Sequence, residues 1–145
     1  MMSNPNSIRE VRIALTVESY EEAVQFYCDG FGLPVVEQWQ TVDGRGVILA
    51  LGPHITLEIF DAAQAALVDQ LEVGKRVSGP VRLAFQVLDV EAEASSLQKA
   101  GAKVLSHPTL MPWGDRNARI ETPDGMQVTL FQAAIPDEQL KEQQQ

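Results

Sequence analysis

Apolar and polar residues alternate in residues 11–17, VRIALTV, where every odd-numbered position is apolar. Side chains of an extended chain switch faces at each residue. The pattern therefore predicts a strand with one apolar core face, and it places Arg12, Ala14 and Thr16 on the opposite face.

A helix is predicted next, over residues 19–30, because an apolar stripe runs through SYEEAVQFYCDG and glycines end it. Ser19 and Glu22 have the spacing of a capping box at its start. Turn residues then separate short apolar runs, which favours an antiparallel meander. The predicted strands cover residues 33–40, 47–52 and 54–60.

The same order of elements restarts after Pro80. A strand VRLAFQV is followed by Asp89 as a helix N-cap, and Gly101 ends the helix. Further strands are predicted from AKVLSHP, from WGDRNARIE and, after the turn TPDG, from MQVTLF.

The two halves keep a nearly constant offset. Arg12 and Arg82 occupy the same place in their strands, seventy positions apart, and the cap positions Ser19 and Asp89 share that offset. The last strands align at an offset of seventy-one, which pairs Glu58 with Thr129 and Phe60 with Phe131. Two strands and a cap in register indicate an internal duplication.

These elements predict an α+β fold of two tandem βαβββ modules that form a curved mixed sheet around a cleft. One face of each half carries the helix, and the other faces line the cleft. We expect one domain over residues 1–145, with module one at about 9–61, a linker at about 62–79, module two at about 80–133 and a tail at 134–145.

Composition narrows the possible partners. The chain has 145 residues, a formal net charge of −9 and 45% hydrophobic residues. Such an acidic globular chain argues against nucleic-acid binding, which needs clustered Lys and Arg. Cys28 is the single cysteine, and neither a signal-peptide pattern nor an apolar run near the ~20 residues of a membrane span is present. We expect a cytoplasmic protein without a membrane partner.

The duplicated unit, the segment VESYEEAVQFYCDGFGL and the segment TPDGMQVTLFQ together resemble the vicinal oxygen chelate superfamily. That group includes glyoxalase I, extradiol dioxygenases, fosfomycin resistance enzymes and bleomycin resistance proteins. Its metalloenzymes carry His or Gln on the first strand of each module and Glu on the last. The resemblance covers residues 11–132.

Carried onto this chain, the four metal-ligand positions of the family fall on Arg12, Glu58, Arg82 and Thr129. Only Glu58 is of a ligand type, because an arginine does not lose its proton and offers no lone pair. We therefore predict no metal site and no cofactor. Without a Lewis acid the metal chemistry of the family is lost, so we incline against an enzyme.

The segment MPWGDRNARIETPDG is similar to a region of the metal-free bleomycin-resistance branch, whose members sequester ligands and form dimers. Thr122 and Ala118 depart from the pattern of that branch. The resemblance implies a small-molecule binding protein of the antibiotic-resistance type that forms a homodimer.

Two interpretations of the cleft arginines stay open. Arg12, Arg82 and Glu58 could form a structural ion network, or the excess of guanidinium charge could bind a carboxylate or phosphate of a ligand. The remaining cleft candidates are aromatic: Phe60, Phe131, Trp39 and Trp113. They favour a small, flat organic ligand with an anionic group.

Three functions are therefore considered. The first is the non-enzymatic binder of such a ligand. The second is an enzyme of the superfamily, a lyase, isomerase or dioxygenase, with an unrecognised metal set or with acid–base chemistry at Glu58. The third is an interaction protein whose cleft is closed by side chains.

Overall fold

The computed structural model describes residues 8–134, so all but the first residue of the predicted tail lies outside the described part. The elements of module one are β1 (Ile8–Thr16), α1 (Tyr20–Gln25), the π-helix η1 (Phe26–Gly30), β2 (Val35–Thr41), β3 (Gly44–Gly52) and β4 (Ile55–Phe60). Helix α2 (Ala62–Glu72) follows. Module two consists of β5 (Val81–Val87), α3 (Val90–Lys99), β6 (Lys103–Leu110), β7 (Arg116–Glu121) and β8 (Gln127–Gln132).

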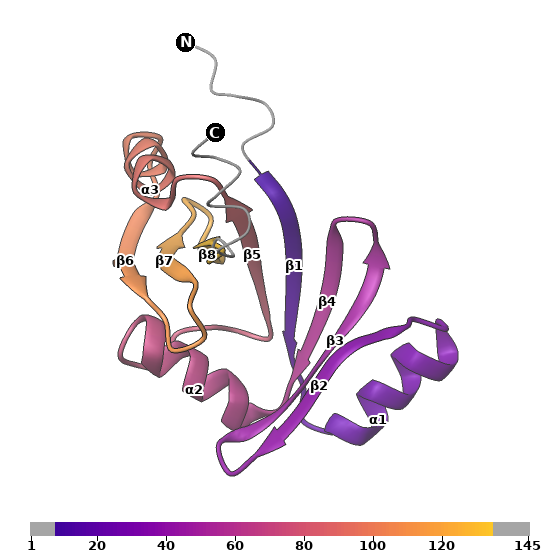
Figure 1. Ribbon diagram of the computed structural model, residues 1–145. Helices are drawn as coiled ribbons and strands as arrows, with labels where there is room; N and C mark the ends of the chain where they lie inside the picture. The colour runs from indigo at the N-terminus through magenta and orange to yellow at the C-terminus, as the bar shows by residue number, and fades with distance from the viewer. Residues whose placement is uncertain (1–7, 135–145) are drawn as a thin grey trace.

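All eight strands form one mixed sheet in the order β2-β3-β4-β1-β5-β8-β7-β6. Each module contains one parallel pair, β1 with β4 and β5 with β8, and the modules join through the antiparallel pair β1 and β5. The sheet curves strongly between its two halves (Figure 1). The predicted α+β fold with two βαβββ modules around a cleft is confirmed, and both modules belong to one chain.

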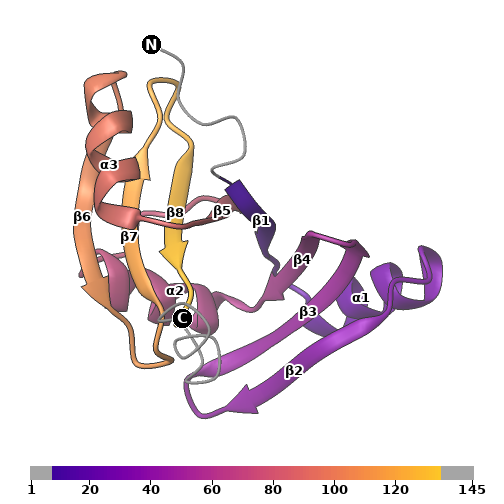
Figure 2. The same ribbon diagram turned by 45° about the horizontal axis from the view of Figure 1, so that its top comes forward.

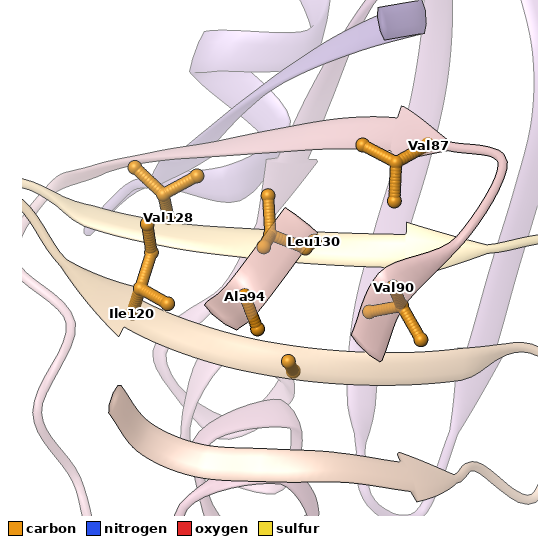
Figure 3. Close-up of a cluster of buried hydrophobic side chains, with 7 residues drawn as sticks. Val87, Val90, Ala94, Ile120, Val128 and Leu130 are labelled. Atoms are coloured by element: carbon orange, nitrogen blue, oxygen red, sulfur yellow. The ribbon is translucent and has the colours of Figure 1, made fainter. Parts of the chain in front are cut away.

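Helices α1 and α3 lie outside the curve, one behind each half of the sheet (Figure 2). Under α1, the odd-numbered residues Val47, Leu49, Leu57 and Ile59 form a buried cluster. The matching cluster of module two lies between α3 and its strands and contains Val87, Val90, Ala94, Ala118, Ile120, Val128 and Leu130 (Figure 3). Burial of these alternating apolar positions fixes which side chains of each strand face the cleft.

The predicted capping box of the first helix is wrong. Ser19 is the N-cap residue of α1, but its side chain makes no capping hydrogen bond. The α-helical turns are also shorter than predicted, because the chain continues as the π-helix η1. The predicted cap of module two is confirmed, since the Asp89 carboxylate accepts a hydrogen bond from the Ala92 N–H at 3.1 Å.

The segment predicted as a linker contains the 11-residue helix α2, begun by the Asp61 carboxylate, which accepts from the Gln64 N–H. This helix contacts β3 and β4 of module one and β7 of module two, on the concave side of the sheet. Gly44 makes this approach possible, because a Cβ there would lie 2.5 Å from the Gln64 main-chain nitrogen. The linker thus forms part of the cleft.

Between residues 8 and 134, no helix has the length and apolar character that crossing a membrane requires.

Candidate functional site

A cavity of about 750 Å³ opens on the concave side, between the sheet and α2. Its volume falls within the range of about 300–1,000 Å³ that is typical of small-molecule sites. The cavity is open, so the hypothesis of a cleft closed by side chains is wrong. All eight predicted cleft residues line it: Arg12, Trp39, Glu58, Phe60, Arg82, Trp113, Thr129 and Phe131.

The pairing of β1 with β5 explains why the positions equivalent in the two modules meet. Arg12 lies opposite Ala84, and Arg82 lies opposite Ala14, so the two arginines are related by a local twofold axis. On the other side of β1, Ala14 pairs with Glu58 of β4, and on the other side of β5, Ala84 pairs with Thr129 of β8. Four side chains on the same face of four adjacent strands thereby surround two alanines.

Arg12 is held by an aromatic ring rather than by a strong ion pair. The carbon at the centre of its guanidinium lies 4.2 Å from the centroid of the Phe131 ring, within cation–π range. Its Nε donates to the Glu10 carboxylate over a long 3.4 Å, and its side chain is 29% exposed. Its two terminal nitrogens therefore stay available to a group in the cavity.

Glu58 is 7% exposed and lines the cavity, and no hydrogen bond or ion pair joins its carboxyl to another residue of the described chain. Burial raises the pKa of Glu58 above its ordinary value, while the charges of Arg82 and Arg12 act against that rise. Neither arginine makes an ion pair with it. Of the two open interpretations, the structural ion network of Arg12, Arg82 and Glu58 is therefore wrong.

Arg82 belongs to a different set of contacts. Its Nη1 donates to the Thr129 hydroxyl at 2.8 Å, and that hydroxyl donates to the Glu72 carboxylate of α2, also at 2.8 Å. Arg119 donates to the same Glu72 oxygen through Nε at 3.3 Å and Nη2 at 3.2 Å. Thr129 thus connects the module-two arginine to α2 instead of serving as a ligand position.

Asp69, one helical turn before Glu72, completes this polar cluster. Its carboxylate forms an ion pair with Arg119 at 2.9 Å and with Arg76 at 2.7 Å, and it accepts from the Ser78 hydroxyl and main chain. Burial alone would raise the pKa of Asp69, but the hydrogen bonds from Ser78, Val77 and Arg76 outweigh burial and hold it well below its ordinary value. The cluster therefore fixes α2 to module two.

The sequence prediction missed Asp69, Glu72 and Arg119. Arg119 is fully buried and lies opposite Thr129 on the neighbouring strand. The sequence did contain a signal for Arg119, because it lies between the apolar residues Ala118 and Ile120. Those two residues face α3, so strand alternation places Arg119 on the cleft face. Asp69 and Glu72 are three positions apart, which places them on one face of a helix.

Aromatic side chains form the walls. The Trp39 ring lies 6.0 Å from that of Phe60, and its indole N–H donates to the Gln64 side chain of α2 at 3.1 Å. Trp113 lies in the loop between β6 and β7 and is 49% exposed. The floor is therefore charged and the rim aromatic.

The residues at the family's metal positions do not fit a divalent cation. Arg12 and Arg82 offer only hydrogen-bond donors, and the Thr129 hydroxyl is already used by Arg82, Arg119 and Glu72. Within residues 8–134, no three His, Cys, Asp or Glu side chains gather in a way that could hold a metal ion. Glu58 is the single oxygen ligand left at the four positions.

Replacing Arg119 by Met should lower the stability of the fold, because the buried carboxylates of Asp69 and Glu72 both lose an ion pair with its guanidinium. Removing one member of a buried ion pair costs about 3–5 kcal/mol. Arg116→Met is the matched control on the same strand, because its ion pair with Glu91 is exposed and contributes about 0–1 kcal/mol. Urea unfolding of both variants measures the difference, and equal losses would contradict this role.

Glu58→Gln should stabilise the protein increasingly as the pH rises. Burial raises the pKa of Glu58 in the folded state above its ordinary value of 4.5. The favourable contribution of Glu58 to the free energy of unfolding is therefore complete below pH 4.5, and it is lost as the pH rises through the folded-state pKa. Thermal unfolding from about pH 4 to pH 8 measures the difference from the unsubstituted protein. Glu37→Gln, which removes an exposed carboxylate of the same cavity, is the matched control.

Solved structures share this fold. A methylmalonyl-CoA epimerase from Mycobacterium tuberculosis is 18% identical, with a TM-score of 0.67 over 96% of this chain and 97% of that one. A methylmalonyl-CoA epimerase in complex with methylmalonyl-CoA and NH4+ is 21% identical, with a TM-score of 0.63 over 89% and 96%. A Vibrio splendidus 12B01 member of the glyoxalase/bleomycin resistance protein/dioxygenase superfamily is 16% identical, with a TM-score of 0.60 over 85% and 97%.

At these identities the likeness concerns the fold alone. No curated protein is significantly similar in sequence. The sequence profile of the Glyoxalase/Bleomycin resistance protein/Dioxygenase superfamily, in contrast, matches residues 10–130, which includes both modules and α2. The chain belongs to the glyoxalase/bleomycin resistance protein/dioxygenase superfamily.

Proposed function

We propose that the cavity binds a small, flat organic ligand that carries an anionic group, and that Arg12 and Arg82 recognise this group. The observation that supports the proposal most directly is the lack of ion pairs between Glu58 and either arginine in the described chain. Within the described residues Arg82 makes no ion pair, and Arg12 makes a single long one, 3.4 Å to Glu10. A ligand carboxylate or phosphate would supply a close partner through charge-assisted hydrogen bonds.

The shape of the cavity supports a planar ligand. Phe60 and Trp39 line the cavity next to each other, and Phe131 lines it beside Arg12. A flat ring system therefore has aromatic faces to stack on. Leu67, Val68 and Leu71 of α2 add apolar contacts. Such a site binds by stacking and by one charged anchor, and it needs no metal at the four family positions.

Sequestration of an aromatic, antibiotic-like compound is the form of this function that we favour. The superfamily description includes bleomycin resistance proteins, and the open cavity has the dimensions of a ligand site rather than of a packing defect. Binding without turnover would require only the arginines and the aromatic walls.

Arg12→Leu should weaken binding of 2-naphthoate by about 10–100-fold, because a charge-assisted hydrogen bond in a buried site contributes about 1.5–3 kcal/mol. The neutral 2-naphthamide should bind the variant and the unsubstituted protein equally. Arg9→Leu serves as the control, because Arg9 is an exposed arginine of the same strand outside the cavity lining. Calorimetry measures the affinities, and equal losses for both compounds would contradict anion recognition by Arg12.

A second function is favoured by one further observation, the unpaired Glu58 carboxyl with its raised pKa. A carboxylate whose pKa is shifted toward neutrality suits a general base, and it could remove a proton from carbon next to a ligand carbonyl. The negative charge left on the ligand oxygen would lie beside the guanidiniums, and Glu58 would return the proton. Structural neighbours of this chain are methylmalonyl-CoA epimerases, so acyl-CoA thioesters are the first substrates to test.

If Glu58 transfers protons, the protein should exchange the α-hydrogen of methylmalonyl-CoA or a related thioester with deuterium in D2O. Glu58→Gln should slow this exchange by about 100-fold or more. Nuclear magnetic resonance of the thioester measures the rate, and Glu37→Gln is the control carboxylate at the rim. Exchange that is unaffected by Glu58→Gln would exclude Glu58 as the base.

A further inference from the structure

Asn117 of β7 lines the cavity with a hydrogen-bond acceptor that the protein leaves unused. The residue is 5% exposed, and its side-chain oxygen Oδ1 has no hydrogen-bond donor within residues 8–134. The other buried side-chain oxygen in that state is the Thr56 hydroxyl, which lies outside the cavity lining. Buried polar atoms in folded proteins nearly always have a partner, so the oxygen of Asn117 calls for one.

Glu72 of α2 fixes the direction of the Asn117 amide. The Asn117 Nδ2 donates to Glu72 Oε2 over 3.4 Å. A carboxylate only accepts hydrogen bonds, so the reverse orientation would place two acceptor oxygens against each other. The amide oxygen therefore points away from Glu72.

The two carboxylate oxygens of Glu72 are themselves used unequally. Oε1 accepts from the Thr129 hydroxyl and from two nitrogens of Arg119. Within the described chain, Oε2 accepts only the long hydrogen bond from Asn117. Because Glu72 also lines the cavity, two residues in contact there have unused capacity to accept hydrogen bonds.

The residues opposite Asn117 on the neighbouring strands do not supply a donor. On β6 its partner is Thr109, whose hydroxyl donates instead to the His107 carbonyl at 2.8 Å. On β8 its partner is Phe131, whose ring carries no donor. A donor for Asn117 has to come from elsewhere than these two positions.

The equivalent place in module one is filled by an aromatic ring. Gly46 lies opposite Phe60 in the way that Asn117 lies opposite Phe131, so Gly46 and Asn117 are equivalent positions. A Cβ at Gly46 would lie 2.2 Å from the ring of Trp39, which occupies that space. The two modules therefore give the cavity different chemistry at equivalent places, a ring in one and a polar amide in the other.

We propose that Asn117 and Glu72 form an acceptor site for a neutral hydrogen-bond donor of the ligand, either a hydroxyl or a carboxamide N–H. A neutral donor fits better than a cation, because both carboxylates of α2 already form ion pairs with arginines. The inference rests on the proposed function, since it concerns the same cavity and adds a second requirement to the same ligand.

The sheet determines where this donor must lie on the ligand. Strand β8 separates β7 from β5, which carries Arg82, so at roughly 4.8 Å per strand the two main chains lie about 10 Å apart. A donor beside the anionic group would stay close to the arginine. The donor must therefore lie toward the other end of the flat ring system.

Substituted naphthoates test this requirement. We expect 6-hydroxy-2-naphthoate to bind about 3–10-fold more tightly than 2-naphthoate, the gain from one added neutral hydrogen bond. The control compounds should show no gain: 3-hydroxy-2-naphthoate has its hydroxyl beside the carboxylate, and 6-methoxy-2-naphthoate has no donor. Calorimetry measures the four affinities.

Two variants assign the gain to Asn117. Asn117→Leu keeps a similar shape and removes the acceptor, so the ratio of the affinities for 6-hydroxy-2-naphthoate and 2-naphthoate should fall to about one. Thr56→Val is the matched control, because it removes the other unpartnered buried oxygen outside the cavity lining, and the ratio should persist. Circular dichroism shows whether each variant folds.

Equal binding of 6-hydroxy-2-naphthoate and 2-naphthoate by the unsubstituted protein would overturn the inference, as would a ratio that survives Asn117→Leu. The methoxy compound needs no variant, and an affinity equal to that of the hydroxy compound would overturn the inference as well. If Arg12→Leu nevertheless weakens 2-naphthoate binding, the proposed function stands and only this inference fails. Absence of binding by every naphthoate would contradict both.

Discussion

The antiparallel pairing of β1 with β5 is the contact on which the site depends. Ile13 lies opposite Leu83 at its centre, and the equivalent residues of the modules are arranged symmetrically on either side. This register brings Arg12, Glu58, Arg82 and Thr129 to one face of four adjacent strands. Because side chains alternate between faces, a shift by a single residue would turn both arginines toward the helices and leave the cavity without its two guanidiniums.

Helix α2 makes the two halves of the site unequal. It approaches module two with Asp69 and Glu72, which Arg119 and Thr129 bind, and Thr129 in turn accepts a hydrogen bond from Arg82. Helix α2 also packs on module one, but within residues 8–134 none of its side chains hydrogen-bonds Arg12 or Glu58. Arg12 instead rests on Phe131, and the Glu58 carboxyl has no ion pair there. The duplicated half-sites therefore differ: one is a structural cluster, and the other is an open surface of the cavity.

This division explains how charge is held in a buried site whose residues do not fit a divalent cation. The carboxylates of α2 neutralise Arg119 and lie near Arg82, which offsets the cost of burying those guanidiniums. Arg12 and Glu58 face the cavity, and under the proposed function a ligand would complete their hydrogen bonds.

The sequence by itself determined the alternation of the strands, the duplication and hence the four positions that meet, because burial of one apolar face fixes the orientation of the other. It also indicated the aromatic residues of the wall. Only the tertiary structure decided which charges pair, since α2 shares no register with the strands and its carboxylates reach Arg119 from a distant part of the chain. Of the two interpretations that the sequence left open, the ion network of Arg12, Arg82 and Glu58 is wrong for that reason: proximity on one face does not fix side-chain pairing when another element supplies competing partners.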